Sequence, residues 1–190
     1  MVVVGQFSGT VDFDPGAGVH NESAGSLDAA FIAKYSRDGG LLWVQTWGSP
    51  DGPTGFDVPD LNVALAPNGD VFVTGTFYYA NSGFGGSGPL TPTGGSGGSD
   101  VFVLKLDGVT DAPVTAFDGD GMLKFGGSDD ESADALVVDN TGSVYVTGHF
   151  SSNDGGFGES GSFHTLGIWD AYVIKLNGTT GTPDIRLVIR

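Results

Sequence analysis

The sequence predicts an all-β protein made of repeated antiparallel sheets, and three observations support this prediction. One hydrophobic phrase occurs three times, at 2–7, 72–77 and 145–150. A second phrase, which ends in lysine, alternates with it at 31–34, 102–105 and 172–175. The apolar runs are short, rich in β-branched and aromatic residues, and bounded by glycine, aspartate, asparagine and proline, as is typical of strands and turns. Because both phrases recur about every 70 residues, we expect a repeat architecture.

The middle repeat predicts four strands in chain order. The first covers 62–66, and the turn Pro67-Asn68-Gly69-Asp70 leads into the second, at 71–78. A long glycine-rich connector precedes the third strand, 101–106, and the fourth covers 122–125. Asparagine or aspartate beside glycine supplies the positive φ that tight hairpin turns require. We therefore expect neighbouring strands to pair in antiparallel fashion.

The other two repeats follow the same order. In the third repeat, strands are expected at 135–138, 144–150, 172–176 and 185–189. The first repeat begins at its second strand, so only three strands are expected there, at 2–7, 31–35 and 41–47. The equivalent apolar positions of the repeated phrases predict the core residues Phe31, Val73, Phe102, Val146 and Tyr172.

Four antiparallel strands per repeat match the blade of a β-propeller, enlarged from the usual ~40–50 residues. The extra length lies in three connectors between the second and third strands, at 8–27, 79–99 and 151–169. The eleven expected strands make about two and three-quarter blades, divided as 1–50, 51–128 and 129–190. Closed propellers carry about 4–8 blades. We therefore expect an open structure, either a fragment of a larger propeller or a chain that associates with copies of itself.

Composition excludes several classes of function. The 190 residues carry 23 acidic and 7 basic side chains, a formal net charge of −16. A surface this negative repels phosphate backbones, so we expect no nucleic-acid partner. Cysteine is absent, which excludes disulfides, thiolate metal sites and cysteine nucleophiles. No apolar run approaches the length of a membrane span, so we expect no membrane insertion.

Two parts of the chain resemble known bacterial repeats. The string Phe7-Ser8-Gly9-Thr10-Val11-Asp12-Phe13-Asp14-Pro15-Gly16, followed by 28–35 and by the tryptophans of 43–49, closely resembles the SBBP β-propeller repeat. Residues 117–121 and 125–130 are similar to the related delta-60 repeat. This resemblance implies an extracellular or cell-surface bacterial protein with a structural role, and it implies no catalytic residues.

Residues Ser36-Arg37-Asp38-Gly39-Gly40-Leu41-Leu42-Trp43 fit the Asp box of sialidase-like propellers. The serine hydroxyl and the carboxylate can bond turn amides while the tryptophan packs beneath them, so the motif braces a turn. Sialidases resemble one another in using three convergent arginines. Here the only arginines are Arg37, Arg186 and Arg190, and two of them lie at the extreme C-terminus. We therefore predict a structural turn and no enzyme.

One acidic region is a candidate calcium site. It combines Asp118 and Asp120, which alternate with glycine, with Asp129 and Asp130. Calcium prefers six to eight oxygen ligands, which alternating carboxylates can supply in part. The full spacing of a calcium-binding loop is missing, so a metal-free acidic turn is the alternative. We expect no required cofactor, and Ca²⁺ as the metal if one binds.

Two functions are compatible with these observations. The preferred one is a non-enzymatic structural, adhesive or self-assembling repeat protein, whose partners are neighbouring blades or other copies in a ring or filament. The alternative is a module that binds a ligand, most plausibly carbohydrate, through the three connectors. Its stacking platforms would be Phe13, Phe84, Phe157 and Phe163. These rings serve equally well to pin their own loops to the blade.

An aspartate and a lysine recur in every repeat around the second phrase. Recurrence in each repeat favours a structural role, such as turn capping or pairing between blades. The residues are Asp28, Asp100 and Asp170, with Lys34, Lys105 and Lys175.

Overall fold

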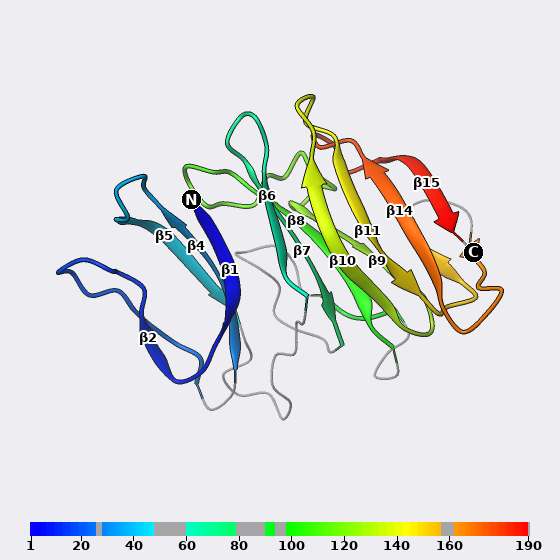
Figure 1. Cartoon of the computed structure of the whole chain (residues 1–190), viewed down its shortest axis with the longest axis horizontal. Coiled ribbons are helices and arrows are strands. Elements are labelled where there is room, and N and C mark those ends of the chain that lie inside the picture. The colour runs from blue at the N-terminus through cyan, green and yellow to red at the C-terminus, as the bar shows by residue number, and fades with distance from the viewer. Residues whose placement is uncertain (26–27, 48–59, 79–89, 94–97, 157–161, 190) are drawn as a thin grey trace.

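The computed structural model describes residues 1–25, 28–47, 60–78, 90–93, 98–156 and 162–189 of the chain. In these residues the regular structure consists of β-strands, and no helix is present. The strands form three main antiparallel sheets and two small two-stranded hairpins. Figure 1 shows the three main sheets side by side in a row, from the first sheet at the left to the third at the right.

The first sheet has three strands in the order β1-β4-β5, with bounds Val2–Phe7, Ala29–Tyr35 and Leu41–Trp47. Strand β1 is an edge strand that pairs with β4 alone, as the incomplete first repeat predicts. Glycine is required in the first phrase for steric reasons. A Cβ on Gly5 would lie 2.9 Å from Cε1 of Phe31, and one on Gly148 would lie 2.7 Å from the hydroxyl oxygen of Tyr172.

The second and third sheets have four strands each, and neighbours in sequence are neighbours in space. The second contains β6 (Asn62–Leu65), β7 (Val71–Phe77), β8 (Asp100–Leu106) and β9 (Met122–Phe125). The third contains β10 (Glu131–Val138), β11 (Val144–Phe150), β14 (Asp170–Leu176) and β15 (Pro183–Ile189). All eleven predicted strands are present.

Two hairpins were not predicted. Strands β2 (Thr10–Asp12) and β3 (Asn21–Ser23) pair within the first connector. Strands β12 (Gly155–Gly156) and β13 (Ser162–Phe163) pair within the third connector. The third connector also reaches back to the second sheet, because Gly156 bridges Gly126 just after β9.

The hydrophobic core consists of two layers, one in each space between successive sheets. Ala30, Ile32 and Trp47 pack with Val73 and Phe102 between the first and second sheets. The layer between the second and third sheets contains Phe72, Val103, Phe125, Val146, Tyr172 and Ile174. The second sheet is therefore covered on both faces, and for this reason every residue of β7 and β8 is buried.

Four of the five predicted core residues are buried, namely Val73, Phe102, Val146 and Tyr172. The prediction for Phe31 is wrong, because its side chain is only partly buried. Phe31 occupies the same position in its sheet as Phe102, which opposes Gly75 in β7 just as Phe31 opposes Gly5 in β1. The first sheet covers Phe102, whereas Phe31 lies on the face of the first sheet that points away from the row.

The row of sheets is open. Strand β1 belongs to the first sheet and pairs with β4, and β15 belongs to the third and pairs with β14. The first and third sheets occupy opposite ends of the row in Figure 1. The two end strands therefore do not seal the described chain into a closed ring.

Candidate functional site

The lysine of the repeated phrase lies at the junction between one sheet and the next. Lys34 in β4 donates a hydrogen bond from Nζ to the carbonyl oxygen of Gly108, in the turn after β8. Lys105 in β8 donates from Nζ to the carbonyl oxygen of Gly178, in the turn after β14, at 2.8 Å. Each bond connects a sheet to the one that follows it. The structural role predicted for these lysines is therefore seen at both internal junctions.

The positive charge of the buried Lys105 side chain is compensated by neighbouring groups. The residue is 6% exposed. Its Nζ lies 3.2 Å from Oδ2 of Asp70 and 5.4 Å from the ring centroid of Phe72. A buried ammonium is stable only when a counter-ion and hydrogen-bond acceptors replace the lost water. This junction supplies both.

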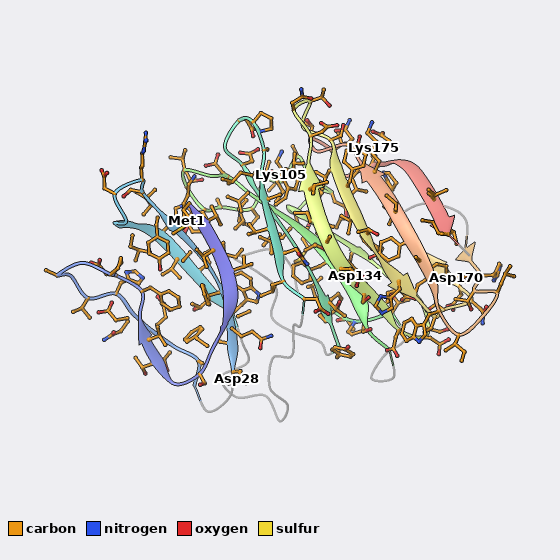
Figure 2. All side chains as sticks on the ribbon, viewed as in Figure 1. Met1, Asp28, Lys105, Asp134, Asp170 and Lys175 are labelled. Carbon is orange, nitrogen blue, oxygen red and sulfur yellow. The ribbon has the colours of Figure 1, made fainter. Side chains whose placement is uncertain are left out.

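Two of the recurring aspartates fix the ends of the connectors, as predicted for turn capping. Oδ2 of Asp100 accepts hydrogen bonds from the backbone nitrogen and the hydroxyl of Thr93, each at 2.8 Å. Oδ2 of Asp170 accepts one from the backbone nitrogen of Leu166 at 3.0 Å. Asp28 is exposed. Figure 2 shows Lys105 and Lys175 toward one end of the strands and Asp28 and Asp170 toward the other.

The serine and tryptophan parts of the predicted turn brace are also present. Oγ of Ser36 accepts a hydrogen bond from the backbone nitrogen of Gly40 at 3.0 Å, and Gly39 has a φ of 90°. Trp43 packs against the core layer between the first and second sheets. Its Nε1 donates to the carbonyl oxygen of Gly108 at 3.4 Å, beside the bond from Lys34. The motif thus supports a junction between sheets.

The third sheet has a face that no other described element covers, and we name it the outer face. Its members are Val137, Tyr145, Val173, Lys175, Leu187 and Ile189. Val137, Leu187 and Ile189 are 58%, 53% and 54% exposed. Lys175 lies 3.9 Å from Asp184 and 5.9 Å from the ring centroid of Tyr145, and its side chain is 26% exposed against 8% for Lys105.

The outer face repeats an internal interface position by position. In the second sheet, Val103 opposes Leu123, and both are buried against the third sheet. In the third sheet, Val173 opposes Leu187 in the same register. Lys175 and Tyr145 likewise stand where Lys105 and Phe72 stand. The third sheet therefore presents an apolar face of the kind that the second sheet uses to bind its successor.

Sequence reasoning missed a polar and aromatic group at one end of this face. The rings of His149 and Trp169 pack edge to face, with centroids 4.8 Å apart. Nδ1 of His149 lies 3.3 Å from Oδ1 of Asp134 and 2.7 Å from Oγ of Ser132. Oγ of Ser132 also lies 3.1 Å from Nε2 of His149, so the serine approaches both ring nitrogens while the carboxylate faces Nδ1. Ser132 and Asp134 lie in β10 and His149 lies in β11, so the pairing of these two strands brings the three side chains together.

The far face of the first sheet is partly covered by the β2–β3 hairpin. Phe13 is 6% exposed, and its ring centroid lies 4.9 Å from that of Phe31 and 5.3 Å from that of Phe7. The hydroxyl of Tyr35 donates to the carbonyl oxygen of Phe13 at 3.1 Å. Phe13 therefore occupies the space that a preceding sheet fills in front of Phe102 and Tyr172. The two ends of the row differ in this respect.

Of the four phenylalanines predicted as sugar platforms, the structure describes the side chain of Phe13 alone. Phe13 is buried in the aromatic group just described, where it pins its own loop to the sheet. Phe163 lies in β13. Phe84 and Phe157 lie outside the described residues. The buried ring of Phe13 offers no open face for a sugar.

The four aspartates of the predicted calcium site do not converge. Asp118 and Asp120 precede β9 and Asp129 and Asp130 follow it, so the strand separates the pairs. Burial and the charge of Asp120 raise the pKa of Asp118. Oδ1 of Asp120 accepts a hydrogen bond from the backbone nitrogen of Met122 at 3.0 Å, and Oδ1 of Asp130 accepts one from Ser99 at 3.2 Å. Among the described residues, no group of three or more histidine, cysteine or acidic side chains could hold a metal ion.

A cavity of about 310 Å³ lies between the turns of the second and third sheets. It is lined by the β6–β7 turn, the β10–β11 turn and the β14–β15 turn, with Phe72 and Lys105 from the strands below. The sequence analysis did not find this cavity, because it forms only where turns from three hairpins meet.

No family model matches the chain, and no curated protein matches it significantly. In the part of the chain that the structure describes, no helix is long and apolar enough to cross a membrane.

Proposed function

We propose that this chain is a non-enzymatic β-propeller-repeat module of the SBBP type, with a structural, adhesive or self-assembling role outside the cell or at the cell surface. Its sheets act as blades, and the outer face binds the first sheet of a second copy, head to tail. The observation that carries the proposal is the match between the outer face and the buried face of the second sheet, residue by residue. No cofactor is required, and calcium binding at Asp118 and Asp120 stays a prediction.

Apolar exposure supports an interface rather than a solvated surface. Val137, Leu187 and Ile189 are each more than half exposed and lie on one sheet face. Large contiguous apolar patches on soluble proteins usually mark binding sites. The equivalent face of the second sheet is fully covered, so the occupant that fits best is another sheet of this repeat.

The position of Lys175 also favours head-to-tail binding. At both internal junctions the equivalent lysine reaches a turn carbonyl of the following sheet. In a head-to-tail pair, Lys175 would reach the turn of residues 36–40 in the second copy. A head-to-tail contact gives a ring if the rotation closes and a filament if it does not. The β2–β3 hairpin of the incoming copy must move aside, because Phe13 fills the same space.

Sedimentation velocity over a range of concentrations tests the proposal. We expect the wild-type protein to associate into a closed ring or an open filament and Leu187→Asp to remain a single chain. Val109→Asp is the matched control, because Val109 is 86% exposed in a turn outside the outer face. A wild-type protein that stays monomeric, or equal effects of the two substitutions on association, would contradict the proposal.

A further inference from the structure

The cavity between the turns has no part in the association proposed above. Its volume of about 310 Å³ lies at the lower end of the range of ligand pockets, roughly 300–1,000 Å³. A cavity of this size suits one small molecule. Polar side chains from three separate turns line it, namely Asn68, Asn140, Thr141, Ser143, Asn177 and Thr179.

The lining is electrically neutral in a very acidic protein. No aspartate or glutamate lines the cavity, although the chain carries 23 acidic residues. The one charged lining residue, Lys105, is paired with Asp70 at 3.2 Å and donates to Gly178. A cation would therefore find no carboxylate in the lining. An anion would meet an ammonium that is already neutralised and a net charge of −16 around it. A neutral ligand fits best.

The lining also has the chemistry that a polyhydroxylated ring needs. Each asparagine amide offers donors and an acceptor, and each hydroxyl offers both. The acceptor of Asn177 is used by the backbone nitrogens of Thr179 and Thr180, which leaves its amide N–H groups for a ligand. Asn140 is exposed, and no hydrogen bond is recorded for its side chain within the described residues. Ala66 and the exposed Pro67 add apolar surface for the C–H groups of a sugar.

The turns around the cavity are held in place without a ligand. Gly142 donates its backbone N–H to the carbonyl of Asp139 at 3.0 Å, and Gly69 donates to that of Ala66 at 2.9 Å. Oδ1 of Asp139 accepts hydrogen bonds from the backbone nitrogens of Thr141 and Ser143, each at 2.9 Å. A preformed site loses less entropy on binding than a mobile one.

From these observations we propose that the cavity binds a neutral sugar ring, with Asn140 and Asn177 as hydrogen-bonding side chains and Ala66 and Pro67 as its apolar wall. This proposal does not depend on self-association. It also differs from the connector-based sugar site, since the cavity lies among the hairpin turns and includes no connector residue.

Saturation-transfer NMR and titration calorimetry with glucose, galactose, mannose and N-acetylglucosamine test the site, with glucuronate and glucosamine as charged probes. We expect at least one neutral sugar to bind more tightly than either charged probe. Asn140→Ala should weaken that binding about tenfold, equivalent to ~1.4 kcal/mol, and Asn140→Trp should abolish it by filling the cavity.

Asn21→Ala is the matched control, because Asn21 is an exposed asparagine in β3, outside the cavity. All three variants should keep the melting temperature of the wild type, since Asn140 is exposed in a turn. The proposal is overturned if no neutral sugar binds, if a charged probe binds as well as the best neutral sugar, or if both Asn140 variants bind like the wild type.

Discussion

Lys105 donates a hydrogen bond from Nζ to the carbonyl oxygen of Gly178 at 2.8 Å, although the two residues are 73 positions apart. The same relationship joins Lys34 to Gly108 one sheet earlier, at a separation of 74. In both cases the separation is close to the repeat length, because the lysine of one sheet reaches the equivalent turn of the next sheet. Glycine is needed at that turn, because a Cβ on Gly178 would lie 1.9 Å from the carbonyl oxygen of Gly142.

Lys105→Met should destabilise the protein by about 3 kcal/mol, because it leaves Asp70 without its counter-ion at a largely buried junction. Lys175→Met should cost well under ~1 kcal/mol, since its pairing with Asp184 is longer and more exposed. Urea denaturation of both variants checks the difference. Equal losses would show that the junction bond contributes little.

Phe102→Ala should cost about 3–5 kcal/mol, the usual range for a fully buried phenylalanine. Phe31→Ala should cost roughly half as much, because that ring is only partly buried, beneath the β2–β3 hairpin and Phe7. The two rings occupy equivalent positions in their sheets, so each is a control for the other. Similar losses would mean that the hairpin covers Phe31 as completely as a sheet covers Phe102.

Glu131 should make stability depend on pH. Burial raises the pKa of Glu131 to about 7, hydrogen bonds from Ser152 and Gly127 lower it in part, and the charge of Asp100 raises it further. Because the folded pKa exceeds the unfolded value of 4.5, the stability contributed by the protonated form is complete below about pH 4.5 and is lost as the pH rises through about 7.

Glu131→Gln should therefore remove this dependence and raise the free energy of unfolding at pH 8, by on the order of 2 kcal/mol. Urea denaturation at pH 5 and pH 8 measures both effects, with the exposed Asp38→Asn as the control. A difference between wild type and Glu131→Gln that is the same at both pH values would rule out titration of this carboxyl in the interval.

Gly148→Ala should destabilise the third sheet strongly, because a Cβ there would lie 1.9 Å from the carbonyl oxygen of Ser132. Gly167→Ala should change stability by less than ~0.5 kcal/mol, because the space around that glycine is open to 4 Å. Thermal melting of the two variants compares them directly. A tolerated Gly148→Ala would show that β10 can shift away from β11 at this point.

Phe13→Ser should increase association by loosening the β2–β3 hairpin from Phe31. Adding Leu187→Asp to the same chain should return it to the monomer, if the partner surface is the outer face. Sedimentation velocity of the single and double variants checks this order of effects. An unchanged or weaker association of Phe13→Ser would argue against competition between the hairpin and a second copy.

The repeated phrases allowed the strands to be predicted closely, because alternation and turn residues act over a few neighbouring positions. The pairing of β6 with β7 and of β10 with β11 follows from the turns at Asn68-Gly69 and Asn140-Thr141-Gly142. The short β2–β3 hairpin could not be predicted in this way, since Thr10–Asp12 and Asn21–Ser23 are brief and polar.

The candidate sites were harder to predict than the strands. For Phe13 the sequence left two roles open, a platform for sugar or an anchor for its own loop, and the rings of Phe7 and Phe31 bury it as an anchor. The cavity depends on Asn68, Asn140 and Asn177, which are far apart in the chain and meet only when two sheets stack. Such contacts depend on the packing of whole sheets and leave no local pattern in the sequence.

The unequal ends of the row would also govern how fast copies join. If copies assemble head to tail as proposed, each newcomer must first release the β2–β3 hairpin from the ring of Phe31. Only the fraction of molecules with a released hairpin is competent, and the apparent dissociation constant rises in inverse proportion to that fraction. Assembly would then have a threshold, with solitary chains persisting in dilute solution and joining once their concentration outweighs the closed population.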